Sequence, residues 1–236
     1  MNYRVDPDVA SRLVPPPFRP RVVKGYAVAG ICLLRMTELR PRPLPRKLGL
    51  RSENAAHRIA VEWEGENGTM SGVYIPRRDS ASIANVIVGG RVYPGVHHRA
   101  RFEVRESDRE IRVRFASYDR STEVGVEVEV VEHLSGSRLF ADLDEASRFF
   151  ERGSVGYSAT SDPSRFDGLE LRTDAWSMAP ARVVRARSSF FEDETRVPKG
   201  GAALDSALLM RQVPVTWSPR SPLRGARTRI RPATHP

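Results

Sequence analysis

The chain of 236 residues lacks cysteine almost completely, since Cys32 is the only one. A single cysteine excludes an internal disulfide and cysteine-rich metal sites. No segment approaches the about 18 apolar residues that a membrane-spanning helix needs. The first residues contain no apolar signal core either. These absences predict a cytoplasmic protein that does not associate with a membrane.

Lysine is also scarce, because the chain has only Lys24, Lys47 and Lys199 among many arginines. The formal net charge of +9 is unevenly spread. Residues 1–51 carry +8, residues 52–210 carry −5 and residues 211–236 carry +6. A nucleic-acid-binding face normally clusters basic residues on one folded element. We therefore predict a folded domain over residues 1–210 and a solvated, basic, Pro/Arg-rich tail over residues 211–236. This distribution of charge argues against a nucleic-acid partner.

Strand signals dominate the chain. The clearest strand is Val124–Val130, where valine alternates with glycine or glutamate. Helices are predicted at Pro7–Val14 after Asp6, at Ala81–Val88 and at Glu145–Arg152, and more weakly at Gly200–Gln212. The expected strands are 22–36, 55–64, 69–77, 100–106, 110–116, 124–130, 169–175 and 181–190. This order predicts a mainly β (α+β) fold, an antiparallel closed or partly open β-barrel with a few short helices at its margins.

Few residues form a chemical motif. The chain has no nucleophile elbow and no phosphate-binding loop of the Walker type. Cys32 lies in an apolar strand, which favours a buried, inert thiol. His97 and His98 are neighbours on a predicted strand, so they face opposite sides and cannot easily share one metal ion. We therefore predict no cofactor and no metal.

Three segments together resemble the acetoacetate decarboxylase-like family. Val5–Pro20 resembles its opening, in which a short helix begins at Asp-Pro and leads into a proline-rich turn. Glu53–Ile75 resembles the following strands of the family, and Ala84–Arg99 resembles its short helix, Gly-Arg turn and lysine-bearing strand. The resemblance covers roughly the first 105 residues, and it implies the family's β-barrel with a small-molecule pocket.

The same resemblance carries an important departure. His97 and His98 match the family's pair of lysines, of which one forms a Schiff base with a β-keto acid. Arg91 matches the arginine of the turn and Tyr93 its aromatic residue, whereas Val92 replaces a glutamate. An imidazole cannot form a Schiff base, so we expect a branch of the family that does not use this mechanism.

The predicted site follows from strand alternation. Ala100, Phe102 and Val104 are the apolar set of their strand, so His98 is expected to face inward with them. An inward histidine with Arg91 and Tyr93 would bind a small carboxylate or keto metabolite. Glu53 and Glu62 are further candidate pocket acids.

Three readings of these residues are open. The histidines can perform acid/base chemistry on a small keto or hydroxy acid, which makes the protein an enzyme. The pocket can instead hold an apolar or acidic metabolite without turnover. In the third reading, His98 is a core histidine and Arg91 caps the turn. Assembly into a homo-oligomer is left open, as is assembly or nucleic-acid contact through the basic tail.

Overall fold

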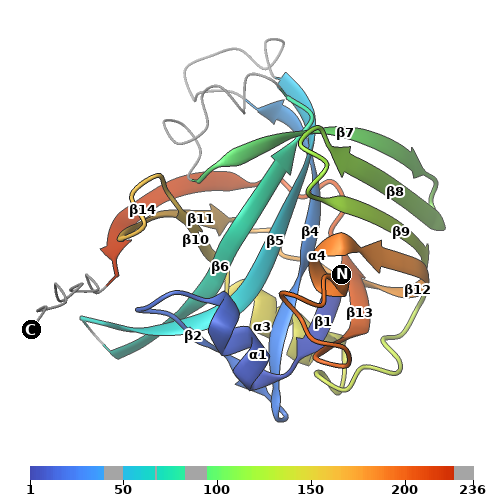
Figure 1. Ribbon diagram of the computed structural model, residues 1–236. Coiled ribbons are helices and arrows are strands. Elements are labelled where there is room, and N and C mark those ends of the chain that lie inside the picture. The colour runs from blue at the N-terminus through green and yellow to red at the C-terminus, as the bar shows by residue number, and fades with distance from the viewer. Residues whose placement is uncertain (40–49, 67, 83–94, 226–236) are drawn as a thin grey trace, which may run out of the picture.

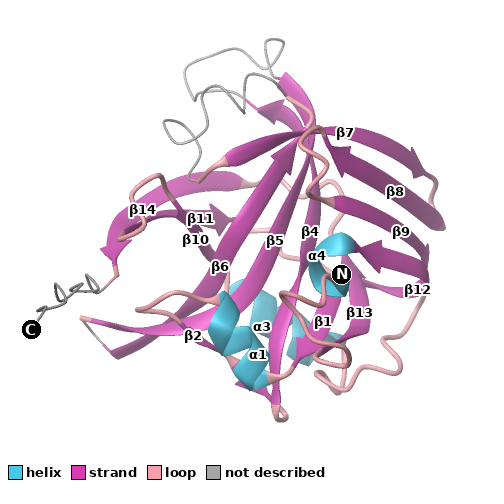
Figure 2. Cartoon of the chain, viewed as in Figure 1, coloured by secondary structure: helices cyan, strands magenta, loops and turns pink. Residues whose placement is uncertain are grey.

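The computed structural model describes residues 1–39, 50–66, 68–82 and 95–225. Its helices are α1 (Pro7–Leu13), α3 (Leu143–Arg152) and α4 (Ser189–Glu192). Its strands are β1 (Asn2–Val5), β2 (Arg19–Pro20), β3 (Val22–Val23), β4 (Tyr26–Leu39), β5 (Leu50–Gly65), β6 (Gly68–Ser80), β7 (His97–Glu106), β8 (Glu110–Ser117), β9 (Glu123–Val130), β10 (Val155–Ala159), β11 (Arg165–Arg172), β12 (Ala179–Ser188), β13 (Ala202–Leu209) and β14 (Thr216–Arg224). Strands therefore dominate, as Figure 2 shows.

Nine of the strands close into a barrel. They pair in the order β6-β7-β8-β9-β12-β13-β1-β4-β5, and β5 pairs with β6 again (Figure 1). This confirms the predicted β-barrel with short helices. Most of the pairings are antiparallel, but β6 pairs in parallel with β7 and with β10, so the barrel is mixed. Parallel neighbours need a long connection rather than a hairpin. Residues 81–96 connect β6 to β7, and residues 81–154 connect β6 to β10.

Strand β6 divides the sheet. Along one edge, residues 73–75 pair with β10, whereas residues 78–80 pair with β7. Its other edge pairs with β5. The strands β10, β11 and β14 therefore branch away from the barrel, as can be followed in Figure 1.

Two predicted helices are confirmed, and each has the expected cap. Asp6 accepts the backbone N–H of Asp8 and of Val9 at the start of α1. At the start of α3, Asp142 accepts the N–H of Glu145. A short polar side chain at this position satisfies N–H groups that have no partner within the helix.

The helix predicted at Gly200–Gln212 is wrong, because this segment contains strand β13. It pairs with β1 on one side and with β12 on the other. These pairings are distant in sequence and outweigh the weak helix propensity. The helix predicted at Ala81–Val88 lies almost entirely outside the described residues. Part of the segment predicted as a solvated tail is strand β14, which pairs with β11 from Thr216 to Arg224.

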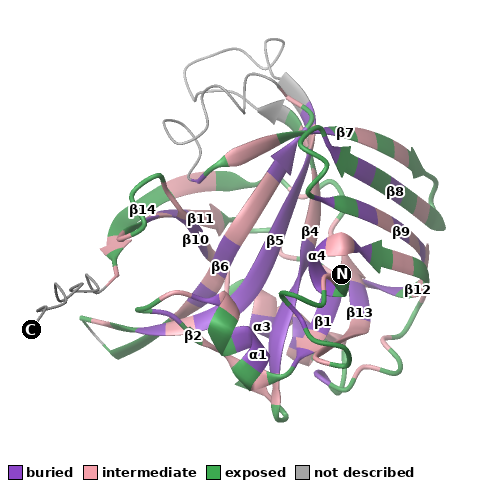
Figure 3. Cartoon of the chain, viewed as in Figure 1, coloured by how far each residue is buried: buried purple, intermediate pink, exposed green. Residues whose placement is uncertain are grey.

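Alternation along the strands produces two hydrophobic cores. The larger includes Val5, Ala29 and Ile59 on the inner face of the barrel. Val28 and Ala60 point the other way and pack with α3 in the smaller core. Figure 3 shows this alternation along β8, where buried and exposed residues follow one another, and along β9, where buried residues alternate mainly with half-buried ones. The wall formed by β4 and β5 thus packs against a hydrophobic core on each side.

Candidate functional site

The two neighbouring histidines lie where β6 meets β7. In this ladder, His97 is opposite Arg78 and His98 is opposite Asp79. Asp79 and Ala100 are buried on the inner face of the barrel. His98 therefore faces inward, as the alternation predicted, and His97 faces the other side of the wall.

His98 belongs to a polar network on the inner face. Its Nδ1 lies 2.8 Å from Oδ2 of Asp119. The guanidinium of Arg77 donates to the Asp79 carboxylate at 2.8 and 3.0 Å, and its Nη2 also lies 3.4 Å from Asp119. The hydroxyl of Ser117 donates to Asp119 at 2.5 Å. These bonds join β6, β7 and the turn after β8.

The two carboxylates of this network are in different electrostatic environments. Hydrogen bonds from the hydroxyls of Ser117 and Ser121, and from the Ser121 backbone N–H, hold the pKa of Asp119 well below its usual range. Burial raises the pKa of Asp79, and the contact with Arg77 opposes this effect. Asp119 is therefore a fixed negative charge that can orient the ring of His98.

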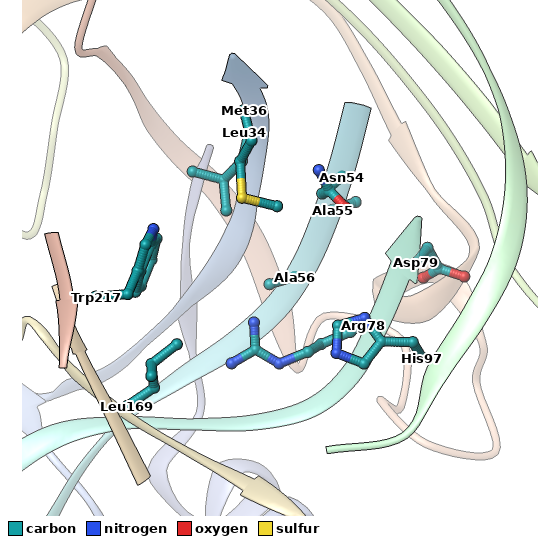
Figure 4. A pocket seen from close by; sticks show the side chains of 10 residues that line it. All are labelled: Leu34, Met36, Asn54, Ala55, Ala56, Arg78, Asp79, His97, Leu169 and Trp217. Carbon is teal, nitrogen blue, oxygen red and sulfur yellow. The ribbon is translucent and has the colours of Figure 1, made fainter. Parts of the chain in front are cut away.

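A small cavity lies on the opposite face of the same strands. Its volume is about 20 Å³, which is room for about one water molecule. It is lined by residues from β4, β5, β6, β7, β11 and β14: Leu34, Met36, Asn54, Ala55, Ala56, Arg78, Asp79, His97, Leu169 and Trp217 (Figure 4). The cavity is therefore enclosed between the barrel wall and the strands that branch from β6.

The polar groups enter the cavity from the barrel wall. Figure 4 shows the guanidinium of Arg78 extending toward Leu169 and Trp217, with the ring of His97 beside it, whereas the carboxylate of Asp79 points away. The Nε of Arg78 donates to Ser158 Oγ on β10 at 3.1 Å. A cation, an imidazole and an indole thus share one apolar cavity.

The other predicted site residues are placed differently or not described. Arg91 and Tyr93 lie outside the described residues. Glu53 accepts a hydrogen bond from Arg35 at 2.6 Å. Glu62 lies 3.6 Å from Arg19 and 3.8 Å from Arg21. These two acids have arginine partners and do not line the cavity.

The guanidinium and the indole of the cavity were not predicted from the sequence. Arg78 follows Arg77 at the end of a predicted strand, and period-two alternation alone could have shown that only one of them faces the barrel interior. Trp217 was assigned to a solvated tail, because Pro and Arg surround it. Nothing local to Trp217 indicates that β14 would pair with β11.

The lysines that the structure describes do not line the cavity. Lys24 lies in the turn between β3 and β4, with its Nζ 3.4 Å from Glu145. Lys199 is exposed in the segment before β13. Lys47 lies outside the described residues.

Two further searches concern only the described parts of the chain. No three or more His, Cys, Asp or Glu side chains gather there in a way that could hold a metal ion. Every helix in these parts is too short or too polar to cross a membrane.

Solved structures place this barrel in a known class. The acetoacetate decarboxylase of Legionella pneumophila subsp. pneumophila str. Philadelphia 1 matches with a TM-score of 0.51 and 11% identity, over 79% of this chain and 68% of that one. An acetoacetate decarboxylase-like enzyme from Sphingomonas wittichii RW1 matches with 0.50 and 12%, over 95% and 86%. The enduracididine biosynthesis enzyme MppR, complexed with pyruvate, matches with 0.50 and 15%, over 88% and 79%. The fold is therefore that of acetoacetate decarboxylase-like proteins.

The chain belongs to the DUF2071 family, described as an uncharacterized conserved protein, whose model matches residues 1–214. A search of curated proteins found no significant match. The resemblance seen in the sequence is confirmed at the level of the fold.

Proposed function

We propose that the cavity beside His97 binds a small carboxylate or keto compound, and that His97 exchanges a proton with it without a lysine Schiff base. The observation that carries this proposal is the convergence of Arg78, His97 and Trp217 on one cavity. Its small volume favours a ligand of a few heavy atoms. Even such a ligand requires Met36 or Trp217 to move aside.

Each group has a chemical role in this proposal. The guanidinium of Arg78 provides charge-assisted hydrogen bonds to a carboxylate. The imidazole of His97 provides the general acid or base that exchanges a proton with a keto or hydroxyl oxygen. Apolar walls strengthen both interactions because they exclude water. His98 acts as a positioning residue, since its bond to Asp119 anchors the strand that carries His97.

A second function, binding without turnover, is favoured by the composition of the cavity wall. Most of the lining residues are apolar: Leu34, Met36, Ala55, Ala56, Leu169 and Trp217. Apolar walls with a few convergent polar groups are typical of ligand-binding pockets in general. Measured turnover distinguishes the two functions.

The test compares ligands with and without a carboxylate. Saturation-transfer NMR would be measured with pyruvate and acetoacetate, with acetone as the ligand that lacks the carboxylate. We expect the two acids to bind, acetone not to bind, and Arg78→Met to weaken acid binding at least about tenfold. Arg101→Met on the exposed face of β7 is the matched control and should bind as the wild type. Equal acid binding by Arg78→Met and the wild type would overturn the site.

Turnover and the mechanism are tested separately. Acid/base chemistry is supported if the wild type consumes acetoacetate and His97→Gln binds it without consuming it. Binding by the wild type without consumption supports the second function. Borohydride added with acetoacetate should trap no adduct, because an imidazole forms no iminium. A reduced adduct on any of the three lysines would overturn the mechanism.

A further inference from the structure

Strand β7 changes its partner along its length. Residues 97–99 pair with β6 on one side, and residues 100–106 pair with β8 on the other. Among the described residues, no strand pairs with the side of residues 100–106 that faces away from β8. We call this side the free edge of β7. Figure 1 shows β7 at the upper margin of the sheet, with β8 and β9 below it.

The free edge lacks the features that protect other edges of this sheet. An unpaired strand edge presents backbone N–H and C=O groups that can pair with another strand. The strands at the two ends of the sheet order are protected, because β2 is two residues long and β14 carries Pro219 and Pro222. Residues 100–106 contain neither proline nor glycine, and their ladder with β8 runs without a register shift. The free edge can therefore accept a further strand.

The inward side chains next to the free edge are only half-buried. Phe102 and Val104 are of this kind, although the ring of Phe102 stacks on Phe115 with centroids 4.8 Å apart. Their partners across the ladder are buried, since Phe115 is 2% exposed and Val113 is 7% exposed. A further strand along the free edge would remove more apolar surface of Phe102 and Val104 from water, which favours its addition.

We propose that the free edge is an interaction surface for a second copy of this chain, whose β7 pairs with it antiparallel about a two-fold axis at Phe102. A two-fold interface uses the same surface on both copies. In this register Arg101 of each copy lies opposite Glu103 of the other, which gives two pairs of opposite charge on the exposed face. On the inward face, Phe102 meets Phe102 of the second copy, and Ala100 meets Val104. The main chain supplies the hydrogen bonds and the side chains fix the register.

The side chains of β7 favour an axis at Phe102 over other positions. An axis one residue away, at Arg101 or Glu103, would place two identical charges opposite each other, which is destabilising. An axis at Val104 would place the ring of Phe102 opposite the carboxylate of Glu106. The axis at Phe102 avoids both conflicts.

One pair of like charges remains at each end of this ladder, where Arg99 of one copy lies opposite Arg105 of the other. Both side chains are exposed, so water and salt screen their repulsion. The guanidinium of Arg99 also packs over the ring of Tyr118 in its own chain, with Cζ 4.6 Å from the ring centroid. The charges at the centre of the ladder therefore decide the register.

The test measures self-association and exchanges the two central charges. Sedimentation velocity of the full chain over a range of concentrations should show a reversible monomer–dimer equilibrium. Arg101→Glu brings carboxylates face to face and Glu103→Arg brings guanidinium groups face to face, so each should raise the dissociation constant of the dimer at least about tenfold. The double variant restores two pairs of opposite charge and should return to the wild-type value. Arg148→Glu, the same change on the exposed face of α3, is the matched control and should dimerise as the wild type.

Hydrogen exchange gives a second readout that needs no variant. Raising the concentration of the wild type through the dimerisation range should slow amide exchange within residues 100–106. A chain that stays monomeric would overturn the proposal, and so would a dimer that the single charge reversals leave unchanged or that the double variant does not restore. The result does not depend on what the cavity beside His97 binds, because the proposal rests on the free edge of β7 alone.

Discussion

A buried histidine, His57, makes the stability of the barrel depend on pH. Its side chain is fully buried on the inner face, and its ring is stacked on Phe190 of α4 with centroids 4.6 Å apart. Neither ring nitrogen has a hydrogen-bond partner among the described residues. Burial, and secondarily the charges of Arg77 and Arg196, lower the pKa of His57 to about 3.

The sign of the effect follows from these two pKa values. In the unfolded chain His57 has a pKa near 6.5, so it takes up a proton there first as the pH falls. Stability that is present above pH 6.5 is therefore lost progressively down to about pH 3. One pKa unit corresponds to about 1.4 kcal/mol, so the loss reaches about 2 kcal/mol at pH 5 and about 5 kcal/mol below pH 3.

The perturbation is His57→Phe, which keeps an aromatic ring against Phe190 and removes the titrating group. Urea unfolding would be measured at pH 8 and at pH 5 for the variant and the wild type. From pH 8 to pH 5 the free energy of unfolding of the wild type should fall by about 2 kcal/mol more than that of the variant. The comparison isolates His57 because all other titrating groups are the same in both proteins. At pH 8 the variant should be at least as stable, because each unsatisfied buried nitrogen costs about 1–3 kcal/mol.

His133→Gln is the matched control, because it removes a histidine whose side chain is exposed and not packed inside the barrel. His57→Leu guards against a steric effect of the larger phenyl ring. If both His57 variants showed the same pH dependence as the wild type, His57 would have a partner in solution and the reasoning would be refuted.

Two further predictions concern the strand fork and the inner network. Deleting residues 215–236 removes β14, which uncovers the edge of β11 and takes away Trp217, so we expect the melting temperature to fall by at least about 4 °C. Deleting only 226–236 removes no described contact and serves as the control. An unchanged melting temperature after the longer deletion would contradict a stabilising role of β14. Asp79→Ala leaves the Arg77 guanidinium without its buried partner, so the free energy of unfolding measured with urea should fall by about 3 kcal/mol. The double variant with Arg77→Met should cost less than the sum of the two single variants, and full additivity would count against a coupled pair.

The sequence was informative where structure depends on local alternation. The valines of 124–130 and the apolar positions after His98 indicated the strands and their inward faces correctly, because a strand has a period of two. The caps at Asp6 and Asp142 also follow from residues within one helical turn. These features need no knowledge of distant parts of the chain.

The site depends on pairings that local patterns do not contain. Trp217 reaches the cavity only because β14 pairs with β11, β11 with β10 and β10 with β6. The helix wrongly predicted around β13 has the same cause, since that strand is specified by its neighbours β1 and β12. Alternation thus showed which way His98 points, but it could not show that the cavity would lie on the side of His97.

The neighbouring histidines have different contacts because they lie on opposite faces of one joint, the short ladder between β6 and β7. Among the described residues, three pairs join β6 to β7, from Arg78 with His97 to Ser80 with Arg99. A ladder this short holds the closed barrel weakly by itself, and the bonds of His98 and Arg77 to Asp119 cross the same joint on its inner face. On the outer face, the joint carries His97 and Arg78 into the cavity. Loosening the inner network should therefore displace the two cavity groups together, so in the proposed function Asp119 is a positioning residue for a site that it does not touch.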